Sequence, residues 1–262
     1  MELLHAYDTQ LRNNEGGVLP AGVTRERDGP LFRLFGFSDG SGFVGYRDLG
    51  GIEGAALDEL IARQVDFFAR RGERFEWKLH GHDRPPDLAA RLRAAGFVPE
   101  EEETVLIAPV ERITAVPRLP EGISLREVSE RRDFERIEAH ERAVWGDASH
   151  SVADADDLEG EQTADPKAIA FIVAEADETV VCAGWVRFQA GMEFATLWGG
   201  STLPAWRSRG IYRAVVAHRA QLAAARGIRY LEVDASSESR PILERLGFDA
   251  VTTTTPYIWS PG

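Results

Sequence analysis

Cysteine is almost absent from the 262-residue chain, which contains only Cys182. A single cysteine excludes an internal disulfide, and we expect a cytoplasmic protein. The sequence has no run of about 18 apolar residues, so no membrane-spanning helix is expected. Its first residues, MELLHAYDTQLRNNEGG, have neither a basic start nor a long apolar stretch, and we expect no secretory signal.

Lysine is also scarce, because Lys78 and Lys167 are the only two and nearly all positive charge is arginine. The formal net charge is −13, which argues against nonspecific nucleic-acid binding and mildly favours a cationic partner. A hydrophobic content of 44% and a charged content of 28% fit an ordinary globular protein.

An internal repeat is present. Residues 70–98 and 226–248 both read as the end of a long helix, an apolar strand, a polar turn and a short helix that ends in Gly-Phe. Pro85 or Pro86 in the first copy, and Pro241 in the second, suit the first turn of the short helix. In the long helix of the second copy, apolar spacing predicts that His218 is packed.

The second copy is preceded by more secondary structure. The pattern predicts a helix over residues 131–145 and strands over 168–176, 179–188 and about 193–203. Residues 108–122 contain three prolines, which is typical of a linker. We therefore expect two mixed α/β modules, residues 1–116 and 117–262.

The stretch LPAWRSRGIYRA, residues 203–214, concentrates positive charge at the start of a predicted helix. The first N–H groups of a helix have no intrahelical partner, and with the helix dipole they favour an anion. Gly210 removes a side chain where the backbone must approach that anion, and Arg207 and Arg209 add charged donors. A solvated helix start is the alternative interpretation.

In its order of elements, and in Pro204, Arg207, Gly210 and Gly247-Phe248, the second half resembles the GNAT superfamily of acyl-CoA N-acyltransferases. The first half resembles a shortened GNAT module without the R-x-x-G loop. The resemblance implies an α+β (mixed α/β) fold of two modules, each a twisted mixed sheet flanked by helices. It implies acetyl-CoA as co-substrate, held by residues of the strand, the loop and the next turn: Ser201, Thr202, Leu203, Arg207, Ser208, Arg209, Gly210, Ile211, Tyr212, Ser236 and Ser239.

The catalytic residues are less clear. The resemblance suggests Glu193 as the base, and Glu232 and Asp234 are alternatives, since their i, i+2 spacing places them on one strand face. A buried carboxylate pair would raise one pKa. Leu243 occupies the position where many relatives have a tyrosine acid, and Tyr257 is an unsupported substitute. Ser236 and Ser239 could bind the coenzyme or cap a helix. His80, His82 and Asp83 offer no convincing metal site, so no metal is expected.

The expected activity is transfer of an acetyl group from acetyl-CoA to a small-molecule amine, which could be cationic. The acidic residues of 147–165 could attract such an amine or form a solvated loop. A non-catalytic acyl-CoA-binding module and a tandem thiol-conjugate synthase are the alternatives. We expect no nucleic-acid or membrane partner, and a monomer or homodimer.

Overall fold

The computed structural model describes residues 2–12, 19, 22–113, 115, 119–146 and 153–262. The module boundary expected near residue 116 lies outside the described residues. Within the described chain, no helix is both long enough and apolar enough to cross a membrane.

The first half contains α1 (Glu2–Gln10), β1 (Thr24–Asp28), β2 (Leu31–Phe35), β3 (Ser41–Gly45), α2 (Gly54–Arg71), β4 (Arg74–His80), α3 (Leu88–Ala94), β5 (Val98–Pro99), β6 (Glu103–Pro109) and the short η1 (Val110–Arg112). The second half contains β7 (Ile123–Val128), α4 (Arg131–Trp145), α5 (Ala155–Ala164), β8 (Ile169–Ala176), β9 (Thr179–Phe188), β10 (Phe194–Thr202), η2 (Pro204–Trp206), α6 (Ile211–Ala225), β11 (Tyr230–Ala235), α7 (Arg240–Leu246) and β12 (Asp249–Trp259).

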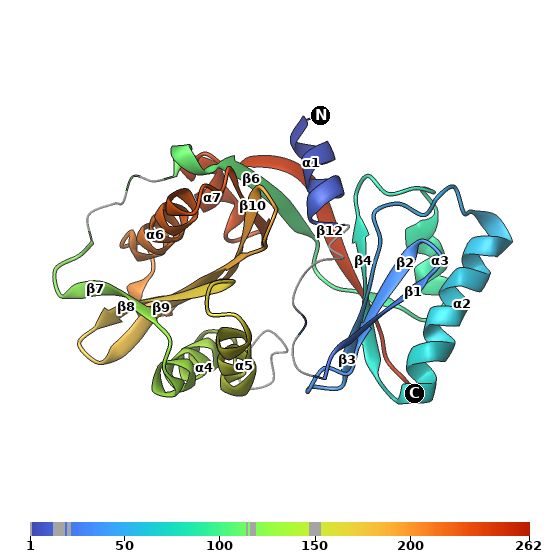
Figure 1. Cartoon of the computed structure of the whole chain (residues 1–262), viewed down its shortest axis with the longest axis horizontal. Helices are drawn as coiled ribbons and strands as arrows, with labels where there is room; N and C mark the ends of the chain where they lie inside the picture. Colours follow the sequence, from blue (N-terminus) through green and yellow to red (C-terminus); the bar gives the residue numbers. More distant parts are fainter. Residues whose placement is uncertain (1, 13–18, 20–21, 114, 116–118, 147–152) are drawn as a thin grey trace.

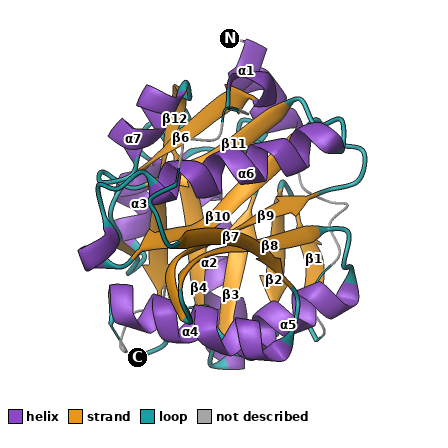
Figure 2. Ribbon diagram, turned by 90° about the vertical axis from the view of Figure 1, so that its left-hand side faces the viewer, coloured by secondary structure: helices purple, strands orange, loops and turns teal. Residues whose placement is uncertain are grey.

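The strands form one continuous mixed sheet in the order β1-β2-β3-β4-β12-β6-β11-β10-β9-β8-β7, with β5 beside β12. In the second half, α6 packs on one face, against residues such as Ala195 and Leu231. Helices α4 and α5 pack on the opposite face, against Phe171 and Trp185 (Figure 2). Helix α1 covers that same opposite face further along, where Tyr7 contacts β6. The mixed α/β fold predicted from sequence is confirmed.

The predicted repeat is present as α2-β4-α3 and α6-β11-α7. Gly72 ends α2 with a φ of 68°, and Gly247 ends α7 with a φ of 106°, as the left-handed C-cap requires. The placement of Pro85 or Pro86 inside the short helix is wrong. Helix α3 begins only at Leu88, because the prolines belong to the preceding turn.

The two halves exchange strands, which the sequence pattern did not predict. β6 follows α3 in the first half but pairs antiparallel with β11 of the second half. β12 follows α7 in the second half but pairs antiparallel with β4 of the first half. β6 and β12 also pair antiparallel with each other, so the two exchanged strands lie side by side at the centre of the molecule (Figure 1). We call this region, where β4, β12, β6 and β11 adjoin, the seam.

Candidate functional site

The sheet opens between two neighbouring strands of the second half. β10 and β11 run parallel and pair only through residues 194–196 and 230–232. Beyond Thr196, β10 pairs only with β9, whereas β11 pairs only with β6. The two strands therefore separate, and the gap between them widens toward the loop that follows β10.

A bulge distorts β10 beside this gap. The register against β9 shifts between Gly199 and Ser201, which leaves Gly200 without a partner residue. Gly199 and Gly200 have φ values of 64° and 83°, a conformation that residues with a Cβ rarely adopt. Gly200 therefore has no partner residue in the β10–β9 register, and its nitrogen lies close to Gly184 of β9.

Arg219 of α6 stabilises this bulge through hydrogen bonds to the backbone of β9 and β10. Arg219 is only 1% exposed, and its guanidinium donates to the carbonyls of Trp185 and Trp198, at 3.1 and 3.0 Å. Burial lowers the pKa of Arg219. The packing predicted for His218 is wrong, because its side chain is part-exposed and its Nε2 lies 3.2 Å from Glu127. The buried polar residue on α6 is Arg219.

The loop after β10 presents backbone donors. Ser208 and Gly210 have φ values of 62° and 84°, and α6 begins directly afterwards. Among the described residues, no backbone carbonyl accepts from the N–H groups of 208–213, and the first such bond joins the Ala214 amide to the Gly210 carbonyl at 3.1 Å. The free N–H groups of Arg209, Ile211 and Tyr212 belong to this set, and each was predicted to contact the coenzyme. Consecutive free N–H groups at a helix start are suited to a phosphate.

The charged side chains of the loop remain at its surface. Arg207 donates from Nε to the Thr202 carbonyl at 3.1 Å, and the Arg209 guanidinium lies 4.8 Å from the centroid of the Trp206 ring. Both arginines are exposed. Thr202 turns its hydroxyl toward Cys182, with 3.3 Å between Oγ1 and Sγ, so only its backbone faces the gap region. Leu203 is held by its amide, which donates to the Val181 carbonyl at 3.0 Å.

Ser201 forms buried hydrogen bonds with two residues of α4. Its Oγ contacts Glu141 Oε1 and lies 2.8 Å from His140 Nε2, while His140 Nδ1 lies 3.0 Å from the Val180 carbonyl. Because Oγ carries one proton, all three contacts are satisfied only if either Glu141 or the second His140 nitrogen carries an additional proton. Burial raises the pKa of Glu141 and lowers the pKa of His140, which favours a protonated Glu141.

The sequence analysis did not predict the hydrogen bonds that link Glu141, Ser201 and His140, although the position of Glu141 indicated them. Glu141 falls on the helical stripe of Phe134 and Ile137, where an apolar residue is expected, and all three side chains are buried. Ser201 was predicted to contact the coenzyme. Its hydroxyl instead joins α4 to the β10 bulge, so only the Ser201 backbone remains for that contact.

Glu193 lies away from the gap. It precedes β10, whose nine residues separate it from the loop by about 30 Å. Its carboxylate accepts from Gln10 at 2.9 Å and pairs with Arg229, and these two contacts lower its pKa. A depressed pKa and a distant position are both unsuited to the predicted base.

Glu232 and Asp234 lie where β10 and β11 separate. Glu232 pairs across the sheet with Thr196, the last such pair before the gap, and Asp234 follows on the same face. Glu232 is 7% exposed, and its burial, together with the nearby Asp234, raises its pKa well above the usual range. Asp234 accepts from Lys78 Nζ at 2.7 Å. A carboxyl group with a raised pKa can serve as a base near neutral pH.

One tyrosine does reach the bulge. Leu243 is fully buried and has no acidic proton, and Tyr257 packs within the first-half core. The Tyr212 ring lies against Gly200, and a Cβ built on that glycine would be 3.7 Å from Tyr212 Oη. Burial raises the pKa of Tyr212, whereas the Arg219 charge lowers it.

The two predicted serines contact each other. Ser236 Oγ lies 3.2 Å from Ser239 Oγ and accepts from the Ser239 amide at 3.3 Å. These bonds form the turn that precedes α7. The interpretation of these serines as turn residues therefore has direct support, whereas Ser239 makes no side-chain capping bond to α7, and a coenzyme contact stays a prediction.

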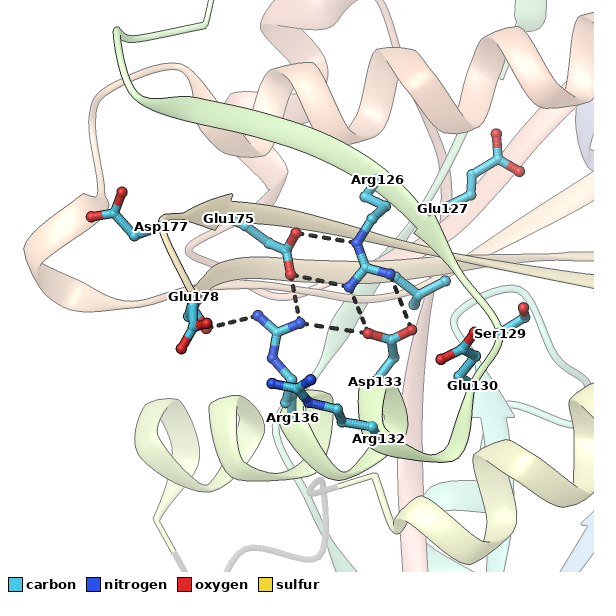
Figure 3. A pocket seen from close by; sticks show the side chains of 11 residues that line it. Arg126, Glu127, Ser129, Glu130, Arg132, Asp133, Arg136, Glu175, Asp177 and Glu178 are labelled. Carbon is cyan, nitrogen blue, oxygen red and sulfur yellow. Dashed lines mark hydrogen bonds and ion pairs between the residues drawn. The ribbon is translucent and has the colours of Figure 1, made fainter.

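A polar pocket of about 420 Å³ lies elsewhere, between β7 and α4 (Figure 3). Arg126 and Arg136 both pair with Asp133 and Glu175, and the hydrogen bonds from Arg126 lower the pKa of each carboxyl group. The ions in this pocket satisfy one another, so the cluster fastens α4 to the sheet. Among the described residues, no His, Cys, Asp or Glu group of three or more could hold a metal ion.

The acidic segment 147–165 is not simply a loop. Residues 147–152 lie outside the described residues, but Asp154 caps the helix α5 through the Asp156 amide at 2.7 Å. Asp156 also pairs with Arg131 at the start of α4, and Glu161 pairs with Arg187 at 2.7 Å. These carboxylates are matched by arginines, so they do not form an unpaired acidic rim.

Comparison with known proteins agrees with this architecture. Residues 131–248 match the sequence profile of the acetyltransferase (GNAT) family. A GCN5-related N-acetyltransferase from Kribbella flavida superposes with a TM-score of 0.68 at 20% identity, covering 92% of this chain and 90% of that one. A tandem GNAT protein from the clavulanic acid biosynthesis pathway gives 0.63 at 13% identity, covering 100% and 95%. A sequence search of curated proteins found no match.

Proposed function

We propose that the chain is an acyl-CoA-dependent acyltransferase of the GNAT type, which acetylates an amine of a small molecule with acetyl-CoA. The match of residues 131–248 to the acetyltransferase (GNAT) family supports this proposal. The observation that carries this proposal is the pairing of a phosphate-suited loop, residues 207–212, with the gap between β10 and β11. The loop would hold the coenzyme pyrophosphate, and its pantetheine arm would lie along the gap.

Glu232 is the proposed base. An alkylammonium has a pKa near 10 and must lose a proton before it can attack a thioester. Helix α6 covers one face of the gap, and Glu232 lies on the other face, beside the Tyr7 cluster of α1, where the amine would approach. The raised pKa of this carboxyl group suits proton acceptance. The nearby charge of Asp234 helps to raise the pKa of Glu232, and Asp234 itself stays paired with Lys78.

Backbone and side-chain donors complete the proposed mechanism. Attack forms a bond between the amine nitrogen and the acyl carbon, the nitrogen of the adduct then loses its second proton to solvent, and a backbone N–H of β10 beyond Thr196, where that strand leaves β11, would donate to the oxyanion. Collapse breaks the carbon–sulfur bond, and Tyr212 would donate its hydroxyl proton to the leaving thiolate. The proximity of Tyr212 to Gly200 supports this role, because the usual tyrosine position is Leu243.

Amine-dependent release of free CoA tests the proposal. The full chain is incubated with acetyl-CoA and a panel of amines, and thiol appearance is followed with a chromogenic reagent. We expect release that depends on both an amine and Glu232, with Glu232→Gln lowering kcat at least about 100-fold. Coenzyme binding without turnover across the panel would instead support a non-catalytic acyl-CoA-binding module.

The remaining expectations stay predictions. A thiol-conjugate synthase of the tandem type would use the same coenzyme loop and differ only in its acceptor. The cytoplasmic location, a monomer or homodimer, and the absence of nucleic-acid and membrane partners rest on sequence composition alone.

A further inference from the structure

Four carboxylates and one amine share a sheet face at the seam. The register places Glu76 and Lys78 of β4, Glu103 of β6, and Asp234 with Glu232 of β11 on the face that α6 leaves uncovered. These residues come from both halves of the chain. Lys78 is the one ammonium among them in the described structure, and it is committed to Asp234 at 2.7 Å.

The sheet is concave at this position. Strands β4 and β11 are separated by β12 and β6, so their backbones would lie about 14 Å apart in a flat sheet. The contact between Lys78 and Asp234 spans both intervening strands. The five charged side chains of this face therefore converge over β12 and β6.

Several buried polar atoms on this face have no partner. Thr254 is 0% exposed, pairs across the sheet with both His80 and Glu103, and has no hydrogen-bond partner for Oγ1 among the described residues. One carboxylate oxygen each of Glu76 and Asp234 also lacks a partner there. Unpaired buried acceptors are costly and indicate that a donor is missing.

Glu232 contributes a hydrogen bond to Asp234, but His80 supplies no donor to Glu76 or Thr254. His80 engages Tyr7 through Nε2 at 3.0 Å, and burial lowers the His80 pKa to about 2, so the ring is neutral. Lys78 and Asp234 keep 21% and 22% of their side-chain surface exposed, which leaves the face reachable from solvent. The missing donor can therefore be a ligand.

We propose that the acceptor is a diamine or polyamine, whose reacting nitrogen meets Glu232 while a second ammonium binds Glu76 and Glu103. This inference rests on the proposed acetyl transfer at the same gap. It assigns the first half a role in substrate selection, because Glu76 and Glu103 precede residue 110 in the chain. An amine of similar length without a second charge would leave the seam carboxylates unpaired.

Three acceptors of matched length test this assignment: 1,4-diaminobutane, butylamine and 4-aminobutanoate. With acetyl-CoA and the full chain, we expect kcat/KM for the diamine to exceed that for butylamine by at least about tenfold, and the aminocarboxylate to be the poorest acceptor. Glu103→Gln and Glu76→Gln should each reduce the diamine preference toward unity. Glu101→Gln, on an exposed neighbour, is the matched control and should leave it unchanged.

Calorimetric titration of 1,4-diaminobutane separates this inference from the proposed function. Diamine binding that Glu103→Gln weakens, without CoA release, keeps the cation site and overturns acetyl transfer. CoA release that is equal for the diamine and butylamine keeps acetyl transfer and overturns the cation site. Circular dichroism spectra of both variants must match the wild type, and Glu76→Gln replaces Glu103→Gln if the latter does not fold.

Discussion

Tyr212 occupies the second position of α6, where its hydroxyl lies beside the β10 bulge. If it protonates the leaving thiolate, Tyr212→Phe should lower kcat by roughly 10- to 100-fold, because general acid catalysis contributes on that order. The dissociation constant for CoA should change little, since the loop amides remain. Steady-state kinetics and CoA titration measure both, and an unchanged kcat would remove Tyr212 from the mechanism.

Glu103 makes stability depend on pH. Burial, with Asp234 nearby, raises its pKa to about 7, above the usual value for a glutamate. The folded state therefore binds the proton more tightly than the unfolded state, and stability falls as pH rises from about 4.5 to 7. Glu103→Gln should remove this loss, which amounts to roughly 2–3 kcal/mol.

Urea denaturation at pH 5 and pH 8 checks this effect. The variant should gain stability relative to wild type at pH 8 but not at pH 5. Glu101→Gln, on an exposed residue close by, should give the same difference from wild type at both values. An equal gain for Glu103→Gln at both values would show that its carboxyl group does not titrate in this range.

At the residue scale, the sequence predicted part of the candidate site. Glu232 and Asp234 could be placed on one face from their i, i+2 spacing, because strand side chains alternate. Glu193 was suggested by the resemblance alone, and its position before β10 places it at the strand end opposite the loop. The partners of Ser201 come from α4, about 60 positions earlier, and no local pattern reports such a contact.

At the element scale, the left-handed Gly210 allows the turn that exposes the loop amides. Gly210→Ala should strain this turn by about 1–2 kcal/mol and weaken CoA binding about tenfold, because the amides would move. Gly227→Ala is the matched control. Gly227 follows the other end of α6, has a φ of 73° and would place its Cβ in open space.

Both glycine variants should lose similar stability in thermal denaturation, whereas only Gly210→Ala should change CoA affinity in a titration. Equal CoA affinity for the two variants would count against the loop as the pyrophosphate site.

The elements themselves were predictable where the apolar period was strong. The helix expected over 131–145 is α4, and the strands expected over 168–176 and 179–188 are β8 and β9 within one residue. Helix α5 was not expected, since its acidic residues show little apolar periodicity. Its Asp156 and Glu159 pair with Arg131, which belongs to another helix, so long-range ion pairs contribute to its position.

At the scale of the whole molecule, the exchanged strands make the halves depend on each other. Fragments 1–113 and 119–262 should each fail to fold alone, because β12 packs Tyr257 into the first-half core and β6 packs Leu106 into the second-half core. Co-expression should restore a one-to-one complex. Size-exclusion chromatography and calorimetry check this, and a cooperative transition in either isolated fragment would contradict it.

Strand order could not be derived from the repeat. Both copies have the same local pattern, and a strand after each short helix could pair within its own half or with the other half at similar local cost. The choice depends on contacts far apart in sequence, such as Tyr257 with Trp77 in neighbouring strands, which periodicity does not encode.

The exchange of β6 and β12 between the halves also sets an order of events during synthesis on the ribosome. The sheet of the first half lacks β12 until nearly all later elements have emerged, so β4 must wait with an open edge beside its neighbours. A nascent chain stalled before residue 249 should therefore expose that edge to chaperones, and slow translation of the second half should favour aggregation of the first.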